Sequence, residues 1–141
     1  MASCTFFGHR DTPKKIEPIL QSTLIDLIEN KNVDSFYVGN QGDFDIMVRC
    51  NLKSLRIIYP YISCYVVVAY KPNKKLSNDY LEYIYPDELK NIFPKYAIIE
   101  RNNWMINKSD YVVTYVENSV GGAARFKRVS EKKGLTVINL A

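Results

Sequence analysis

Residues 110–140, DYVVTYVENSVGGAARFKRVSEKKGLTVINL, decide the fold class because they hold two strand patterns separated by one helix pattern. The apolar, β-branched run at 110–116 predicts a strand, and LTVINL at 135–140 predicts another. Between them, residues 121–134 predict a helix that stops at Gly134, since glycine is a usual residue just past a helix C-terminus. Strand, helix and strand in this order predict two parallel strands joined by a helical crossover.

The same alternation continues back to the N-terminus. Apolar residues recur at helical spacing within 9–31, 43–59 and 98–109, whereas short apolar runs at 3–8, 35–39 and 63–70 predict strands. We therefore predict an α/β fold, with a single domain over 1–141. It is a Rossmann-like open sheet of about five mainly parallel strands, flanked by helices, with the first strand in the interior.

Residues 71–97 interrupt this alternation with a polar segment that holds three prolines and tyrosines at positions 80, 83, 85 and 96. Long connections in small domains are often functional. The segment is therefore interpreted either as a lid over a site or as a surface excursion with a short helix at 87–92. Its tyrosines also fit the anchors of an interface, and we expect a homodimer.

Composition limits the classes of function. A net charge of +4 and a pI of about 8.9 are weaker and less clustered than is usual for a dedicated nucleic-acid binder. Cys4, Cys50 and Cys64 are widely spaced and predict reduced core residues of a cytoplasmic protein. No signal peptide or membrane span is visible in the sequence. A single histidine offers no metal-ligand set, so we expect neither a metal nor a cofactor.

Polar and glycine residues collect where the predicted strands end, which is where open parallel sheets bind ligands. Glycine next to a helix N-terminus lets backbone N–H groups approach an anion closely. The paired glycines at 121–122 are explained either by a tight turn or by such a phosphate cradle, and a second glycine turn lies at 39–42. The predicted ligand-binding residues are Gly8, His9, Arg10, Gly39, Asn40, Gly42, Asp45, Arg101, Asn102, Ser119, Gly121, Gly122, Ala123 and Arg125; no catalytic residue is assigned.

Three side chains allow more than one interpretation. His9 follows a glycine at a strand end and suits either an acid–base group or a hydrogen bond to a ligand. Asp45, in the first turn of a helix, is either a partner of the helix dipole or a carboxylate that binds ribose hydroxyls. Trp104 is either a core residue or a platform for a base.

The stretches TFFGHRD, FYVGNQGDFD, RNNWMINKSDYVVTYV and GGAARFKRVSEKKGLTVINL together resemble the SLOG superfamily, and in particular its short stand-alone bacterial and phage members, the YpsA-like branch. The likeness covers nearly the whole chain. The superfamily takes its name from DprA (SMF), which binds single-stranded DNA, and from LOG, a cytokinin-activating phosphoribohydrolase. The resemblance implies a Rossmann-like fold that binds nucleotides or their derivatives. Some members are sensor domains in anti-phage systems that bind signals of the cyclic ADP-ribose type.

The chain departs from the hydrolase pattern of this superfamily at one place. The LOG enzymes carry an Arg on a helix before a strand, followed by PGGxGTxxE. Arg101 matches that Arg in position, and Gly121 and Gly122 match the first two glycines. The third glycine, the Thr and the catalytic Glu are missing, and Ala124, Arg125 and Lys127 lie in that region instead.

Three functions remain open on this basis. The first is the binding of a nucleotide or an ADP-ribose-like ligand, for sensing or sequestration, in conflict between bacteria and phages. The second is a hydrolase that cleaves the N-glycosidic bond of a nucleotide, with His9, Asp45 or Glu100 replacing the missing Glu. The third is DprA-like binding of single-stranded DNA, for which a stronger basic stripe would be expected.

Overall fold

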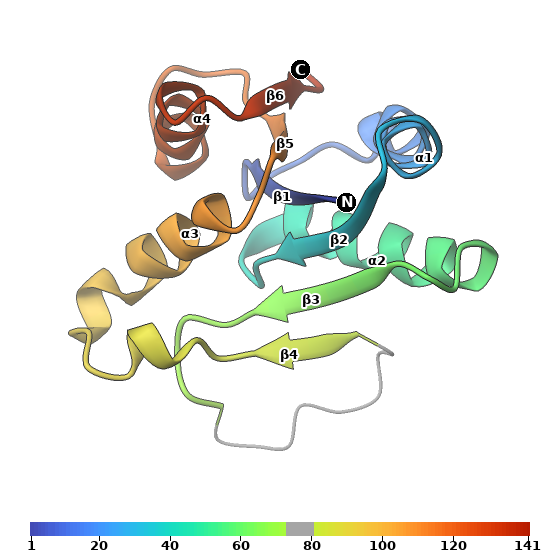
Figure 1. The fold of residues 1–141 in the computed structure, drawn as a ribbon. Helices are drawn as coiled ribbons and strands as arrows, with labels where there is room; N and C mark the ends of the chain where they lie inside the picture. Colours follow the sequence, from blue (N-terminus) through green and yellow to red (C-terminus); the bar gives the residue numbers. More distant parts are fainter. Residues whose placement is uncertain (73–80) are drawn as a thin grey trace.

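A computed structural model describes residues 1–72 and 81–141. Within these residues, six strands form one open sheet in the order β4-β3-β2-β1-β5-β6, and every neighbouring pair is parallel (Figure 1). The strands are β1 (Ala2–Gly8), β2 (Val33–Val38), β3 (Ser63–Val67), β4 (Glu82–Ile84), β5 (Tyr111–Tyr115) and β6 (Thr136–Asn139). The α-helices are α1 (Glu17–Asn30), α2 (Gly42–Ile58), α3 (Ala97–Asn107) and α4 (Gly122–Lys132).

The predicted α/β architecture is confirmed, with β1 in the interior of a parallel sheet. The structure has one strand more than expected, because Glu82–Ile84 pairs with β3 as an edge strand inside the segment 71–97. The short helix predicted at 87–92 is present only in part, as a 3₁₀ helix at Asp87–Leu89, and a second 3₁₀ helix follows at Pro94–Tyr96.

The helices cover the two faces of the sheet in pairs, which explains why the central strands are apolar on both sides. Phe6 and Phe7 are adjacent in β1 and therefore point to opposite faces. Phe6 stacks on Phe36 in the core shared with α1 and α2. Phe7 stacks on Phe126 of α4 in the core shared with α3. In Figure 1 the two helix pairs lie on either side of the twisted sheet.

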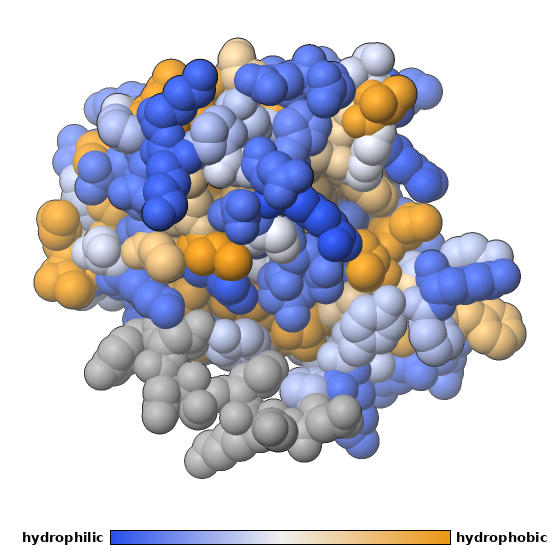
Figure 2. Space-filling model, turned by 180° about the vertical axis from the view of Figure 1, so that it is seen from behind, coloured by the Kyte–Doolittle hydropathy of each residue, from blue (hydrophilic) through white to orange (hydrophobic). Residues whose placement is uncertain are grey.

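The C-terminal end of α2 lies at the surface, where two expectations for this helix prove wrong. The helical spacing of the apolar residues in 43–59 predicts that Ile58 lies on the buried face, but this residue is 66% exposed; Cys50 is exposed as well, whereas Cys4 and Cys64 are buried as predicted. Figure 2 shows a small orange group at the margin of the molecule where α2 ends. In the two described ranges, no helix is both long and apolar enough to cross a membrane.

The order of the strands places a crevice beside β1. The chain leaves β1 toward α1 and β2 on one face, and leaves the neighbouring β5 toward α4 and β6 on the other face. Two adjacent strands whose connections diverge leave an opening at their carboxyl ends, which is where ligands bind in open α/β sheets.

Candidate functional site

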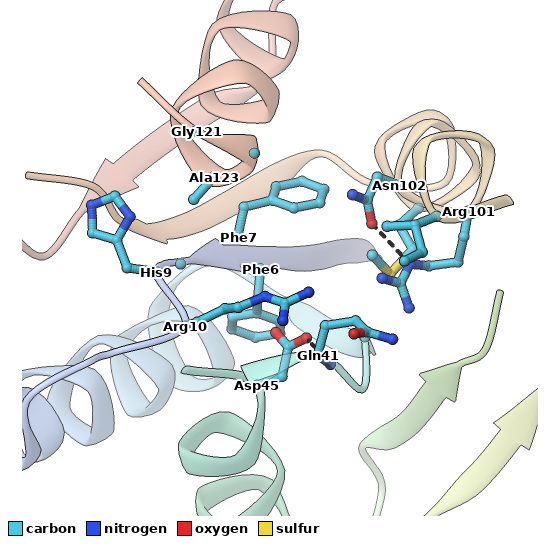
Figure 3. Close-up of a pocket in the computed structure, with 15 residues that line it drawn as sticks. Phe6, Phe7, His9, Arg10, Gln41, Asp45, Arg101, Asn102, Gly121 and Ala123 are labelled. Carbon is cyan, nitrogen blue, oxygen red and sulfur yellow. Dashed lines mark hydrogen bonds between the residues drawn. The ribbon is translucent and has the colours of Figure 1, made fainter. Parts of the chain in front are cut away.

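A cavity of about 340 Å³ lies at this switch point. It crosses the end of β1, from the N-terminus of α4 on one face of the sheet to the N-terminal part of α2 on the other, and α3 forms one wall (Figure 3). Its volume is in the range of pockets for small molecules. The lining residues are Phe6, Phe7, Gly8, His9, Arg10, Gly39, Gln41, Asp45, Ile98, Arg101, Asn102, Met105, Gly121, Gly122 and Ala123.

The structure brings most of the predicted ligand-binding residues together in this cavity. Four predicted residues do not line it. Asn40 lies just behind the wall and accepts a hydrogen bond from Arg101. Gly42 is packed against Arg10. The carbonyl of Ser119 accepts from Arg128, and the exposed Arg125 lies over the ring of Phe126.

The sequence prediction missed Phe6, Phe7, Gln41, Ile98 and Met105. Four of these are apolar, and apolar side chains next to a site have the same pattern in the sequence as core residues. Gln41 stands between two predicted positions in the glycine turn at 39–42, and that position was the available signal.

The two glycines at the start of α4 have different reasons to be glycine. Gly121 has φ 101° and ψ 174°, a conformation that is essentially restricted to glycine. Gly122 has no positive φ, and a Cβ atom there would meet no atom within 4 Å. The turn therefore accounts for Gly121 only. The fold does not require glycine at 122, where the missing side chain leaves the cavity wall open.

The N-terminus of α4 also carries unpartnered donors. Among the residues that the structure describes, no side chain caps it, and the first amide groups of a helix have no partner within the helix. These N–H groups and the positive end of the helix dipole favour an anion. Figure 3 shows Gly121 and Ala123 at one side of the cavity, above Phe7.

The glycines on the other side of the cavity are explained by packing. A Cβ atom on Gly8 would lie 2.2 Å from Cγ of Phe44, which is fully buried. Gly42 has φ 86°, and a Cβ there would lie 2.8 Å from Cα of Arg10. The turn at 39–42 is therefore a structural turn at Gly42, so it supports a phosphate cradle less than 121–122 does.

Arg101 is held rigidly in the wall of the cavity, with only 2% of the residue exposed. Its Nε donates to Oδ1 of Asn102 at 2.8 Å, and its Nη1 donates to the Val67 carbonyl at 2.9 Å and to Oδ1 of Asn40 at 3.3 Å. Burial lowers the pKa of Arg101, against the opposing field of Asp45. The guanidinium still keeps its proton, as arginine does in proteins.

Asp45 is the buried carboxylate of the cavity, 7% exposed. Its Oδ2 accepts a hydrogen bond from the Gln41 backbone N–H at 2.9 Å. Burial raises the pKa of Asp45 to about 6, although the Gln41 amide, Arg101 and Arg49 each favour the charged form. Asp45 is therefore more than a surface partner of the α2 dipole, and it titrates close to neutral pH.

His9 braces the loop between β5 and α4. Its Nε2 accepts a hydrogen bond from the Glu117 backbone N–H at 2.9 Å, so that nitrogen carries no proton in this arrangement. The ring also makes an edge contact with Tyr115, whose hydroxyl donates to Oε1 of Glu117 at 2.6 Å. The geometry therefore favours a positioning role for His9 and leaves only Nδ1 for a ligand.

Other candidate residues lie away from the cavity. Trp104 packs edge-on against Tyr37, and its Nε1 donates to Glu88, which agrees with the core interpretation. Glu100 is exposed and does not line the cavity. Within the described parts of the segment 71–97, no residue lines the cavity. Tyr80 and the rest of 73–80 lie outside the described residues.

Comparison with models of known protein families gave no match, and comparison with curated proteins gave none. Fold and cavity alone define the class of protein: an α/β chain with an open parallel sheet and a small cavity, lined by both charged and apolar residues, at the carboxyl ends of its central strands.

Proposed function

We propose that this protein binds a phosphorylated small molecule, namely a nucleotide or an ADP-ribose-like derivative, and acts by sensing or sequestering it. The observation that carries the proposal is the α4 N-terminus: uncapped amide groups and a glycine at 122 that the fold does not require, both facing a cavity. An anion is the ligand that such a helix end favours.

Cationic side chains at the cavity support the same conclusion. Arg10 extends into the cavity from the end of β1 in Figure 3, and Arg101 stands in the opposite wall. Phe7, Met105 and Ile98 also line the cavity and offer apolar surface against which a flat ring can pack. An anion site, further cations and an apolar wall within one small cavity suit a nucleotide, and membership of the SLOG superfamily would fit this function.

The experiment is titration calorimetry of the protein with AMP and with ADP-ribose. Gly122→Asp adds bulk and negative charge at the helix N-terminus, so we expect it to weaken binding at least tenfold. Gly122→Asn is the matched control, because it adds a side chain of the same size at the same open position without the negative charge, so we expect it to bind more tightly than Gly122→Asp. If both variants are folded and bind the ligands as the wild type does, the anion site is not at α4.

A second candidate function, hydrolysis of an N-glycosidic bond, is favoured by one observation: a cavity carboxyl whose pKa is about 6 is tuned as a general acid or base would be. Against it, the described residues that line the cavity include no carboxylate at the α4 end, where the hydrolase pattern of the superfamily has its Glu. The exposed Arg125 lies outside the cavity, so its charge does not bear directly on the reaction.

We expect no release of free base from AMP, GMP, CMP, UMP or NAD, measured by chromatography. Arg101→Ala serves as the control. Turnover that disappears in this variant would replace the binding function by the hydrolase.

A further inference from the structure

Two buried, oppositely charged side chains of the cavity each keep one polar atom without a partner. Arg101 donates to protein groups through Nε and Nη1 only, and Asp45 accepts through Oδ2 only. Within residues 1–72 and 81–141, nothing accepts from Nη2 of Arg101 or donates to Oδ1 of Asp45. Buried charged groups are costly when their hydrogen-bonding capacity is unused, so these two atoms indicate where a ligand belongs.

Gly39 lies close to both side chains. A Cβ atom built on Gly39 would lie 2.9 Å from Oδ2 of Asp45 and 3.0 Å from Nη1 of Arg101. A larger residue at this position would therefore press on both the carboxylate and the guanidinium, whereas glycine leaves this space open, and no ion pair joins the two groups in the described ranges. Figure 3 shows Asp45 next to Gln41, to which a hydrogen bond joins it, and Arg101 beyond Gln41 at the α3 wall.

The chemistry of a matching ligand group follows from this arrangement. The group must donate to a carboxylate and accept from a guanidinium at the same place, which a hydroxyl does. Two neighbouring hydroxyls satisfy both charges together. A phosphate is opposed here by the negative charge of Asp45, so the anion belongs at α4, on the other side of β1.

We propose that Asp45 and Arg101 form a hydroxyl-binding subsite for the vicinal diol of a sugar phosphate whose phosphate lies at the N-terminus of α4. This inference rests on the proposed binding function and selects ribose-containing ligands over their deoxy counterparts. Arg101 contributes as a fixed donor because its other nitrogens are bonded to the protein. Asp45 accounts for the discrimination between ribose and deoxyribose ligands. A deoxy ligand lacks a hydroxyl that can donate to Asp45, so the carboxylate stays buried and unsatisfied in that complex.

The subsite is also sensitive to pH in a defined direction. The charged groups that face Asp45 are Arg101 from α3, Arg49 from its own helix and Arg10 from the end of β1; His9 lines the same cavity. Because burial raises the pKa of Asp45 to about 6, acidification through that value protonates the carboxyl and replaces its charge-assisted hydrogen bond to a hydroxyl by a weaker neutral one. The preference for a diol is therefore nearly full at pH 7.5, half lost at about pH 6 and small at pH 5.

The test is calorimetry with AMP, 2′-deoxy-AMP and 3′-deoxy-AMP at pH 7.5. We expect the wild type to bind AMP at least tenfold more tightly than either deoxy ligand. Asp45→Asn should reduce this preference to within about threefold. Asp43→Asn, an exposed position in the same helix turn, should keep the wild-type preference.

A second measurement does not depend on any variant. The ratio of the AMP and 2′-deoxy-AMP affinities of the wild type is followed from pH 7.5 to pH 5. Both ligands carry the same phosphate, so its own titration cancels in the ratio, and we expect the ratio to fall toward one as Asp45 is protonated.

The outcomes separate the two proposals. Equal affinity for AMP and the deoxy ligands at pH 7.5, with Gly122→Asp still abolishing binding, overturns the diol subsite and leaves the binding function standing. A preference for AMP that persists unchanged in Asp45→Asn and at pH 5 assigns the discrimination to other groups and also overturns it. No binding of any of these ligands, or of ADP-ribose, refutes the binding function and the subsite together.

Discussion

Replacing Asp45 by Asn should stabilise the ligand-free protein. The carboxylate is buried, it accepts one hydrogen bond from the Gln41 amide, and its pKa stands at about 6 in the folded chain against an ordinary value of 3.8. The folded state therefore disfavours the charged form. The interval of about 2 pH units, at 1.36 kcal/mol for each, corresponds to about 3 kcal/mol of destabilisation at neutral pH. Asparagine is neutral and keeps an oxygen that can accept from Gln41.

The sign and the pH window follow from the same values. Between pH 3.8 and 6 the folded protein holds the Asp45 proton more tightly than the unfolded chain does. The stability that Asp45 contributes as a protonated group is thus present below pH 3.8 and is lost as the pH rises through 6. We expect Asp45→Asn to exceed the wild type by about 1.5 kcal/mol at pH 5 and by about 3 kcal/mol at pH 7.

The assay is urea unfolding, followed by circular dichroism, at pH 5, 6, 7 and 8. At each pH the free energy of unfolding of the variant is compared with that of the wild type, so the contributions of the other titrating groups cancel. Asp43→Asn is the control and should change the free energy of unfolding by less than about 1 kcal/mol at every pH, since Asp43 is exposed at the α2 N-terminus. The reasoning is refuted if Asp45→Asn is no more stable than the wild type at pH 7, or if its advantage is the same at pH 5 as at pH 7.

Gly8→Ala should lower the free energy of unfolding by about 1–3 kcal/mol in urea titrations, because its Cβ would collide with the buried ring of Phe44; an unchanged midpoint would contradict the packing. Gly121→Ala should lower the free energy of unfolding by a similar amount, because φ 101° and ψ 174° suit glycine only. Gly122→Ala should leave the free energy of unfolding unchanged or raise it by up to about 1 kcal/mol. Thermal melts that rank the two variants the other way would refute the assignment of the turn to Gly121. The homodimer stays a prediction. Tyr83 and Tyr85 pack against the core, so Tyr96, which is 47% exposed, is an available anchor for the interface. Light scattering that reports a mass of about 16 kDa would contradict the dimer.

Local patterns were enough to predict the fold because its central strands are covered on both faces. The run CTFF gives no alternation, yet its length and its flanking Gly8 indicate a buried strand, and Phe6 and Phe7 do enter opposite cores. The strand Glu82–Ile84 was missed because three residues at an edge carry no period, and its pairing with β3 depends on a partner distant in the sequence.

The limits for the site are of a similar kind. Sequence could place Gly8 and Gly42 at strand and helix ends, but their reasons for being glycine are contacts with Phe44 and Arg10, which are remote in the chain. The free oxygen of Asp45 could not be predicted either, because it depends on Arg101 bonding to Val67 and Asn102 instead of to this carboxylate. The topology of the sheet predicts which strand ends lie close together. Which polar atoms at those ends lack a hydrogen-bond partner can be seen only in the three-dimensional structure.

Two features of the cavity work against, or contribute nothing to, the stability of the fold. Gly122 begins a helix where alanine would be at least as stable, and Asp45 is held charged in a place that favours its neutral form. Functional sites are where we expect residues that another amino acid could replace with no loss, or with a gain, in stability. These two lie at opposite ends of one cavity, and one favours an anion while the other favours a hydroxyl. A single ligand that spans the end of β1 and carries both groups would account for both residues, whereas an inorganic phosphate would account for Gly122 alone.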